Sequence, residues 1–370
     1  MASSSSHFFI KHAFFHILLT LTISTPYAIG CYTAIFGFGD SLTDTGNSVH
    51  LSNSTEPPHY ALPPNGETYF HHPTGRSCDG RLIIDFIAQN LGLPLVPPYF
   101  GGSNAGGAAD FENGVNFAVV GAPALDDSFF EEKGIPNSYI NISLRCQLSW
   151  FKDLLPSLCF TSSDCSKFLQ NSLFILGEFG GNDYTRSFSA GKSLEEVESY
   201  VPLVVDAIAS ATNELIELGV ETIMVPGLLP PGCSAAVLTT YRTSDMEAYD
   251  PTTGCLTWLN KFAEYHNEHL QIELNRNSRT TSLCFTKGAL TACCGAGELP
   301  YHFNSSAPCG YPPSFAFDDP FLYVNWDGPH LTEAAYRLIT KSLLEGPYTI
   351  PHINTSCVST IVSAEYPNFG

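Results

Sequence analysis

The sequence predicts an α/β protein with a central parallel sheet that is covered by helices on both faces. Apolar runs of strand length alternate along the chain with longer segments of helical period. Repeated strand-helix-strand order favours parallel pairing, because the chain must return through a crossover before the next strand can run in the same direction. No linker-like composition or internal repeat divides the chain, so we expect residues 29–370 to form a single domain.

The expected elements follow from local patterns. Buried strands are expected at 32–38 (YTAIFGF), 114–120 (GVNFAVV), 172–176 (SLFIL) and 221–226 (ETIMVP), and helices at 81–90, 194–218, 256–277 and 332–344. The segments 52–76, 97–113 and 285–320 are rich in Pro, Gly, Ser and Asn and lack clear periodicity, so they are interpreted as insertions. Ligands of an open parallel sheet bind where the strands end, and the residues after each strand are therefore the candidates for a site.

The first 28 residues have the pattern of a cleaved signal peptide. They carry one charge, Lys11, followed by an apolar run at 13–19 and small residues up to Ala28. A buried N-terminal helix is the alternative. The run is short for a membrane helix, and no uncharged apolar stretch of spanning length follows residue 40, so no stable membrane span is expected. These features predict a protein of the secretory pathway, destined for the extracellular space, the cell wall or the vacuole.

Glycosylation sequons and cysteines agree with secretion. N-x-S/T sequons begin at Asn53, Asn141, Asn304 and Asn354. The 12 cysteines form an even set without zinc-finger spacing, so disulfides are expected. Cys159 and Cys165 bracket a short polar loop, but spacing alone does not determine the pairing.

Charge and histidine spacing exclude some function classes. The chain holds 36 acidic and 16 basic residues, a net charge of −20, which repels phosphate backbones and argues against nucleic acid as a partner. His71–His72 and the pair His266 and His269 lack the carboxylates or cysteines that would complete a metal site. We therefore expect no metal, no other cofactor, and a monomer that acts on a small molecule.

Ser41 is the first candidate for chemistry. It follows the expected strand 32–38 and stands two residues after Gly39, where a tight turn would expose its hydroxyl. A helix N-cap is the structural alternative for such a serine. The segment Gly39–Asn47 (GDSLTDTGN) resembles the nucleophile block of the plant GDSL esterase/lipase family, within the SGNH hydrolase superfamily. It does not match the G-x-S-x-G elbow of α/β-hydrolases.

Three further blocks resemble the same family in the same order. They are 114–122 (GVNFAVVGA), 177–184 (GEFGGNDY) and 326–332 (WDGPHLT), so the resemblance extends over nearly all of the chain after the N-terminal segment. It implies a three-layer α/β/α flavodoxin-like SGNH fold. It also implies that Ser41 is the nucleophile, that Asp327 and His330 complete the triad, and that Ser41, Gly121 and Asn182 form the oxyanion hole.

Ester hydrolysis explains why these residue types are needed. A serine hydroxyl requires a neutral imidazole to take its proton, and a carboxylate on the other ring nitrogen fixes the tautomer. Donors aimed at the tetrahedral intermediate stabilise its oxyanion. Singly, Asp327 and His330 could satisfy a loop, and Gly121 and Asn182 could form turns. Together they supply each group that a hydrolase requires.

The sequence therefore predicts a secreted serine esterase that hydrolyses acetyl, short-acyl or phenolic acyl esters through an acyl-Ser41 intermediate. It is most similar to the subgroup that contains acetylajmalan and sinapine esterases. Two alternatives remain: an acyltransferase with the same triad, and a catalytically idle secreted binding protein that kept the fold.

Overall fold

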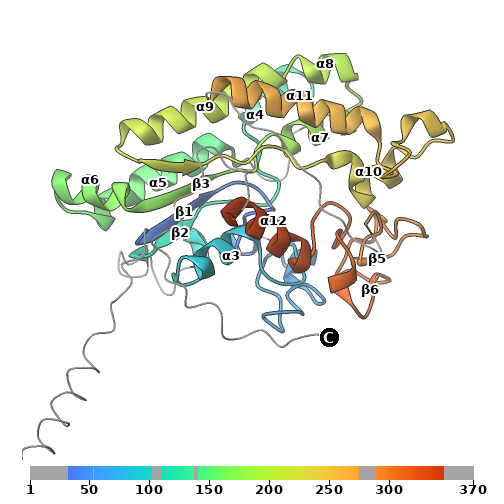
Figure 1. The fold of residues 1–370 in the computed structure, drawn as a ribbon, viewed down its shortest axis with the longest axis horizontal. Helices are drawn as coiled ribbons and strands as arrows, with labels where there is room; N and C mark the ends of the chain where they lie inside the picture. Colours follow the sequence, from blue (N-terminus) through green and yellow to red (C-terminus); the bar gives the residue numbers. More distant parts are fainter. Residues whose placement is uncertain (1–31, 53, 102–110, 137–140, 275–288, 346–370) are drawn as a thin grey trace, which may run out of the picture.

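A four-stranded parallel sheet lies at the centre of the computed structural model, which describes residues 32–52, 54–101, 111–136, 141–274 and 289–345 (Figure 1). Its strands are β1 (Ala34–Phe38), β2 (Gly114–Asn116), β3 (Ser172–Leu176) and β4 (Thr222–Met224), in the order β2-β1-β3-β4. β1 pairs in parallel with both β2 and β3. The predicted α/β class with a parallel sheet is confirmed, and the carboxyl ends of β1 and β3 meet at one edge.

Helices cover both faces of this sheet (Figure 1). One face carries α3 (Ile83–Asn90) and α12 (Glu333–Glu345), and the other carries α5 (Leu144–Leu158), α9 (Val201–Glu217) and α11 (Thr257–Glu273). The shorter helices are α2 (Asn47–Leu51), α4 (Asp127–Glu132), α6 (Ser162–Gln170), α7 (Gly181–Ser189), α8 (Leu194–Glu198) and α10 (Ala235–Thr240). A small antiparallel pair, β5 (Cys294–Gly295) and β6 (Phe315–Ala316), lies apart from the main sheet.

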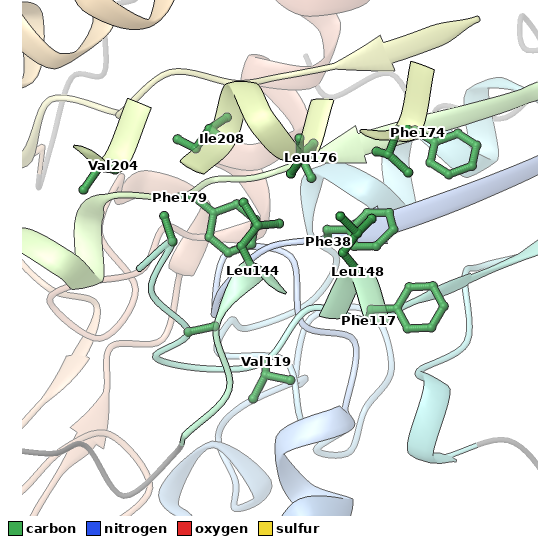
Figure 2. Packing of buried hydrophobic residues seen from close by; sticks show 14 of the residues in the cluster. Phe38, Phe117, Val119, Leu144, Leu148, Phe174, Leu176, Phe179, Val204 and Ile208 are labelled. Atoms are coloured by element: carbon green, nitrogen blue, oxygen red, sulfur yellow. The ribbon is translucent and has the colours of Figure 1, made fainter. Parts of the chain in front are cut away.

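Successive side chains of β1 point to opposite faces of the sheet, so the hydrophobic core has two layers. Phe36 and Phe38 pack with residues of α5 and α9, whereas Ile35 packs with residues of α3 and α12. Figure 2 shows the first of these layers, between the strands and the helices. On the second face a Cβ at Gly37 would lie 2.7 Å from the Ile84 Cδ1 atom, so glycine at this position allows α3 to approach the sheet closely.

Two predicted elements differ from the structure. The strand predicted over 114–120 is observed only at Gly114–Asn116. Beyond it the Ala118 N–H donates to the Asn116 side-chain oxygen, although the Phe117 and Val119 N–H groups still donate to the Gly37 and Gly39 carbonyls. The helix predicted over 194–218 is divided into α8 and α9. Pro202 stands in the first turn of α9, where its missing N–H costs nothing, and it could not continue α8.

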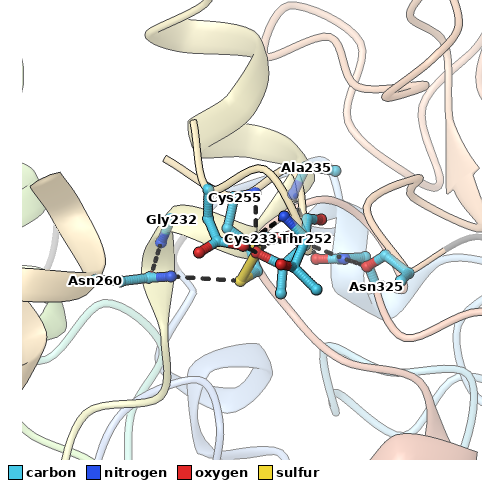
Figure 3. The surroundings of a disulfide bond; sticks show 10 residues. Gly232, Cys233, Ala235, Thr252, Cys255, Asn260 and Asn325 are labelled. Carbon is cyan, nitrogen blue, oxygen red and sulfur yellow. Dashed lines mark hydrogen bonds between the residues drawn. A yellow bond between two sulfur atoms is a disulfide. The ribbon is translucent and has the colours of Figure 1, made fainter. Parts of the chain in front are cut away.

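Three disulfides are present in the described part of the chain: Cys159–Cys165, Cys233–Cys255 and Cys294–Cys309. Figure 3 shows the second, beside Asn260, whose side-chain oxygen accepts from the Gly232 N–H at 2.8 Å. The next residue, Ser234, donates its hydroxyl to the Gly328 carbonyl at 2.8 Å. This disulfide therefore lies next to an anchor of the loop that contains Asp327 and His330.

Several predictions concern residues that the structure does not describe. The N-terminal segment 1–28, Asn53 and Asn354 lie outside the described residues, whereas Asn141 and Asn304 are both exposed. Within the described ranges, the helices are too short or too polar to cross a lipid bilayer.

Candidate active site

Ser41 lies in a tight turn directly after β1. The backbone of Gly39 is clamped by Gln147 of α5, which accepts from its N–H at 2.9 Å and donates to its carbonyl at 2.8 Å. A Cβ on Gly39, whose φ is +156°, would lie 2.7 Å from the Gly177 carbonyl oxygen after β3. The turn can therefore approach the end of β3 only with glycine at this position. Ser41 itself is 9% exposed.

Two carboxylates stabilise this turn. Asp40 accepts from the Leu42 N–H at 2.9 Å, and Asp44 accepts from the backbone N–H groups of Gly46 and Asn47 at 2.7 Å. Asp44 also accepts from the Val120 N–H, which connects the nucleophile block to the segment after β2. Burial raises the pKa of Asp44.

Asp327 and His330 form a buried pair before α12. The His330 Nδ1 atom lies 2.9 and 2.8 Å from the two carboxylate oxygens of Asp327, and the His330 backbone N–H donates to the same carboxylate at 3.0 Å. Burial opposes both charges, but their mutual attraction outweighs it. The pKa of Asp327 is therefore lowered and the pKa of His330 is raised from its ordinary value of 6.5.

Asn182 and Gly121 lie beside the turn. Asn182, in the first turn of α7, donates its side-chain amide to the Asp40 carboxylate at 2.8 Å and to the Ala122 carbonyl at 3.2 Å. Gly121 has a φ of +79°, and a Cβ there would meet nothing within 4 Å. Within the described chain, the backbone N–H groups of Ser41 and Gly121 donate to no protein acceptor.

The structure thus brings four blocks of sequence together, although not every predicted contact is formed. Asp40 and His330 each shift the pKa of the other electrostatically, which places the nucleophile turn near the histidine. The side-chain hydrogen bonds of His330 to described residues go to Asp327, and none reaches Ser41.

Two ionisable groups near these residues were not predicted. His59, in the aperiodic segment 52–76, is close enough to feel the charges of Asp327 and His330, and burial lowers its pKa. Glu178, after β3, is half-buried, and its loss of hydration together with the Asp40 charge raises its pKa well above the ordinary value. No periodic or motif signal in the sequence could have placed His59 there, because the contact depends on how a long insertion folds.

Two of the histidines considered for metal have hydrogen-bond partners within the protein. His266 shares a 2.7 Å hydrogen bond with the Tyr184 hydroxyl inside the core, and the His71 ring bonds the Glu67 carbonyl. Among the residues that the structure describes, histidines, cysteines and acidic residues nowhere form a group of three or more that could hold a metal ion.

Comparison with known proteins identifies the family. The model of the GDSL-like lipase/acylhydrolase family matches residues 35–343, which contain every candidate residue of the triad and the oxyanion hole. The chain belongs to this family. Two GDSL esterase/lipases of Arabidopsis thaliana are 48% and 49% identical to it, covering 94% and 89% of this chain and 95% and 89% of their own. A sinapine esterase of Brassica napus is 44% identical over the full length of both chains. This GDSL-family protein is a carboxylic ester hydrolase.

Proposed function

We propose that this protein is a secreted serine esterase that hydrolyses acetyl, short-acyl or phenolic acyl esters of small molecules through an acyl-Ser41 intermediate. One observation supports this proposal above the others: the Asp327–His330 pair and the Asn182 amide both lie near the turn that contains Ser41. We further propose that residues 29–370 form one SGNH hydrolase domain, a range within which the family match falls.

In the proposed mechanism, the Ser41 Oγ atom attacks the ester carbonyl carbon while His330 accepts the hydroxyl proton on Nε2. Asp327, on Nδ1, holds the ring in the tautomer that leaves Nε2 free, and it stabilises the imidazolium. The N–H groups of Ser41 and Gly121 and the Asn182 amide bind the oxyanion. The intermediate expels the alcohol, which takes the proton from His330. Water then attacks the acyl carbon while His330 takes one of its protons. The second tetrahedral intermediate breaks its bond to the Ser41 Oγ atom, which regains the proton from His330 as the carboxylic acid leaves.

The proposed substrate class rests on the relatives. A relative named sinapine esterase aligns with the whole chain, which supports a small ester of a phenolic acid as the substrate. A panel of purified acetyl, short-acyl and hydroxycinnamoyl esters would rank these candidates by kcat/KM.

The role of Ser41 is tested by covalent trapping with a fluorophosphonate, followed by peptide mapping. We expect a single label on Ser41, because only a serine with a base and oxyanion donors reacts readily. Ser41→Ala should abolish both labelling and ester hydrolysis, while the matched control Ser163→Ala, at an exposed position on α6, should keep both. A label on another serine, or undiminished hydrolysis by Ser41→Ala, would contradict the proposal.

The acyltransferase alternative differs only in what attacks the acyl-enzyme. Adding an alcohol acceptor during ester hydrolysis separates the two activities, since a hydrolase diverts only a minor share of the acyl group. Dominant transfer at low millimolar acceptor would support the acyltransferase.

Secretion is proposed from the N-terminal segment and the sequons. Expression in a eukaryotic secretory host should give a chain that begins near residue 29 and carries N-glycans at the exposed residues Asn141 and Asn304. Intact mass before and after deglycosylation measures both features. An uncleaved, unglycosylated product retained in the cell would contradict secretion.

A further inference from the structure

Both hydrogens of the Asn182 side-chain amide are already engaged in the resting enzyme. One donates to the Asp40 Oδ2 atom at 2.8 Å and the other to the Ala122 carbonyl at 3.2 Å. An amide nitrogen has two hydrogens, so a substrate oxyanion must take one of these over. The longer contact with the neutral Ala122 carbonyl is the weaker one, whereas the contact with a carboxylate is charge-assisted. The Asp40 contact is therefore the one expected to persist while the amide turns toward substrate.

Asp40 joins this amide to the nucleophile turn. Its second carboxylate oxygen accepts from the Leu42 N–H at 2.9 Å, and its carbonyl accepts from the N–H groups of Thr43 and Asp44. The residue is 5% exposed, so water does not compete freely for these bonds. Only a carboxylate can accept at both positions, because an asparagine would direct one NH₂ group at another donor.

The charges around Asp40 come from several elements. His330, before α12, attracts the Asp40 charge, and that charge in turn helps to raise the pKa of Glu178, after β3. Asp327 also raises the pKa of His330, and the His330 charge contributes to the lowered pKa of His59. Burial raises the pKa of Asp40 to about 6, so the carboxylate is ionised at neutral pH and loses its charge in mild acid.

We propose that Asp40 is a positioning residue of this esterase, whose carboxylate fixes the Asn182 amide at the correct distance from the Ser41 turn for oxyanion binding. The inference rests on the proposed function, in which Asn182 is an oxyanion donor. It adds that the orientation of the Asn182 amide is set by Asp40, the residue that precedes the nucleophile.

A double-mutant cycle between Asp40→Asn and Asn182→Ala tests the coupling. We expect Asn182→Ala to lower kcat on the order of 100- to 1000-fold, the usual loss of one oxyanion donor, with little change in KM. Asp40→Asn should lower kcat roughly 10- to 100-fold for the same reason, and the double variant should be no slower than Asn182→Ala alone. Losses that multiply in the double variant would overturn the proposal.

Asp79→Asn is the matched control. Asp79 is also buried, with a pKa raised by burial to about 6, but its carboxylate accepts from the Glu333 backbone N–H rather than from Asn182. Any loss of kcat in Asp79→Asn should multiply with that of Asn182→Ala. Thermal unfolding of each variant separates lost stability from lost alignment.

The pH profile gives a readout that a merely structural role would not change. Anionic Asp40 favours the His330 imidazolium, so removing its charge should move the midpoint of the rising limb of kcat/KM to lower pH. An unchanged midpoint in Asp40→Asn would count against the proposal.

If Asp40→Asn does not fold, the wild-type enzyme still allows a test. The side-chain amide resonances of Asn182, assigned by their loss in Asn182→Ala, should shift with pH around a midpoint of about 6 as Asp40 titrates. Resonances that stay constant from pH 5 to 8 would overturn the inference. Activity that survives in Ser41→Ala would instead refute the proposed function, so the two failures are distinguishable.

Discussion

Replacing Asp327 with asparagine should almost abolish activity, because it replaces a hydrogen-bond acceptor beside the His330 Nδ1 atom with a donor. In the wild-type enzyme both carboxylate oxygens lie within 2.9 Å of His330 Nδ1, and one of them also accepts from the His330 backbone N–H at 3.0 Å. An asparagine that keeps this backbone hydrogen bond must direct its NH₂ group at Nδ1. Nδ1 then becomes the acceptor, and Nε2 carries the hydrogen and cannot take a proton from Ser41.

The size of the loss follows from this tautomer change. The corresponding substitution in a serine protease triad reduces kcat about 10⁴-fold with the geometry intact. At about 1.36 kcal/mol for each factor of ten, that corresponds to about 5.4 kcal/mol of lost transition-state stabilisation. The variant also loses the carboxylate charge that raises the pKa of His330, so that pKa should fall.

Hydrolysis of p-nitrophenyl acetate from pH 5 to 9 measures both effects. In the wild-type enzyme kcat/KM should rise with pH as His330 loses its proton, with a midpoint above the ordinary value of 6.5, because Asp327 stabilises the protonated form. Asp327→Asn should stay low across the range. The matched control Asp250→Asn, at a surface carboxylate that caps a turn, should keep the wild-type profile. A variant that regains the wild-type plateau at high pH, with only its midpoint moved, would refute the tautomer argument.

Three stability predictions follow from buried contacts, each measured by urea unfolding. Replacing Cys294 and Cys309 with serine opens a loop of 15 residues and should cost about 3 kcal/mol; a change below about 1 kcal/mol would show that the link is not closed in the protein. Arg76→Met leaves the buried Asp85 carboxylate, 2.7 Å from the guanidinium, without its cation and should cost about 3 to 5 kcal/mol; a neutral effect would mean that water replaces the guanidinium. Phe36→Ala, at a fully buried ring of β1, should cost about 3 to 5 kcal/mol unless the core collapses around it.

The elements that sequence predicted well are those whose pattern is local. The strand 172–176 was predicted at its observed bounds, because a fully buried parallel strand is a continuous apolar run. The strand that begins at Gly114 was predicted too long, since its apolar run continues beyond Asn116, whose side chain takes the Ala118 N–H in place of a regular strand conformation. The helix predicted over 194–218 is interrupted at residues 199–200, because the helical period of the side chains continues there although Pro202 has no N–H with which to extend α8.

At the candidate site, sequence predicted which residues gather but not how they connect. The order of the four blocks placed Ser41, Asn182 and His330 at the ends of successive elements, and the structure brings those blocks together. The contact between Asp40 and Asn182 could not be predicted, since it depends on the rotation of two side chains that are distant in sequence. The proximity of His59 to the histidine-aspartate pair depends on the path of an insertion without periodicity.

The contacts between α12 and the start of α3 bear on which parts of the chain must be present before this enzyme can be active. Arg81, before α3, donates its backbone N–H and its guanidinium to Glu333, the first residue of α12, which follows the His330 loop directly. The proposed nucleophile at position 41 is synthesised early and its base at position 330 late, so the two can meet only after the His330 loop has been made. A nascent or proteolytically clipped chain that ends before residue 327 would hold Ser41 without Asp327 and His330, whereas one that lacks only α12 would keep both residues but lose the contacts of Arg81 with Glu333. We therefore expect catalysis only from chains in which synthesis has passed the loop that contains Asp327 and His330.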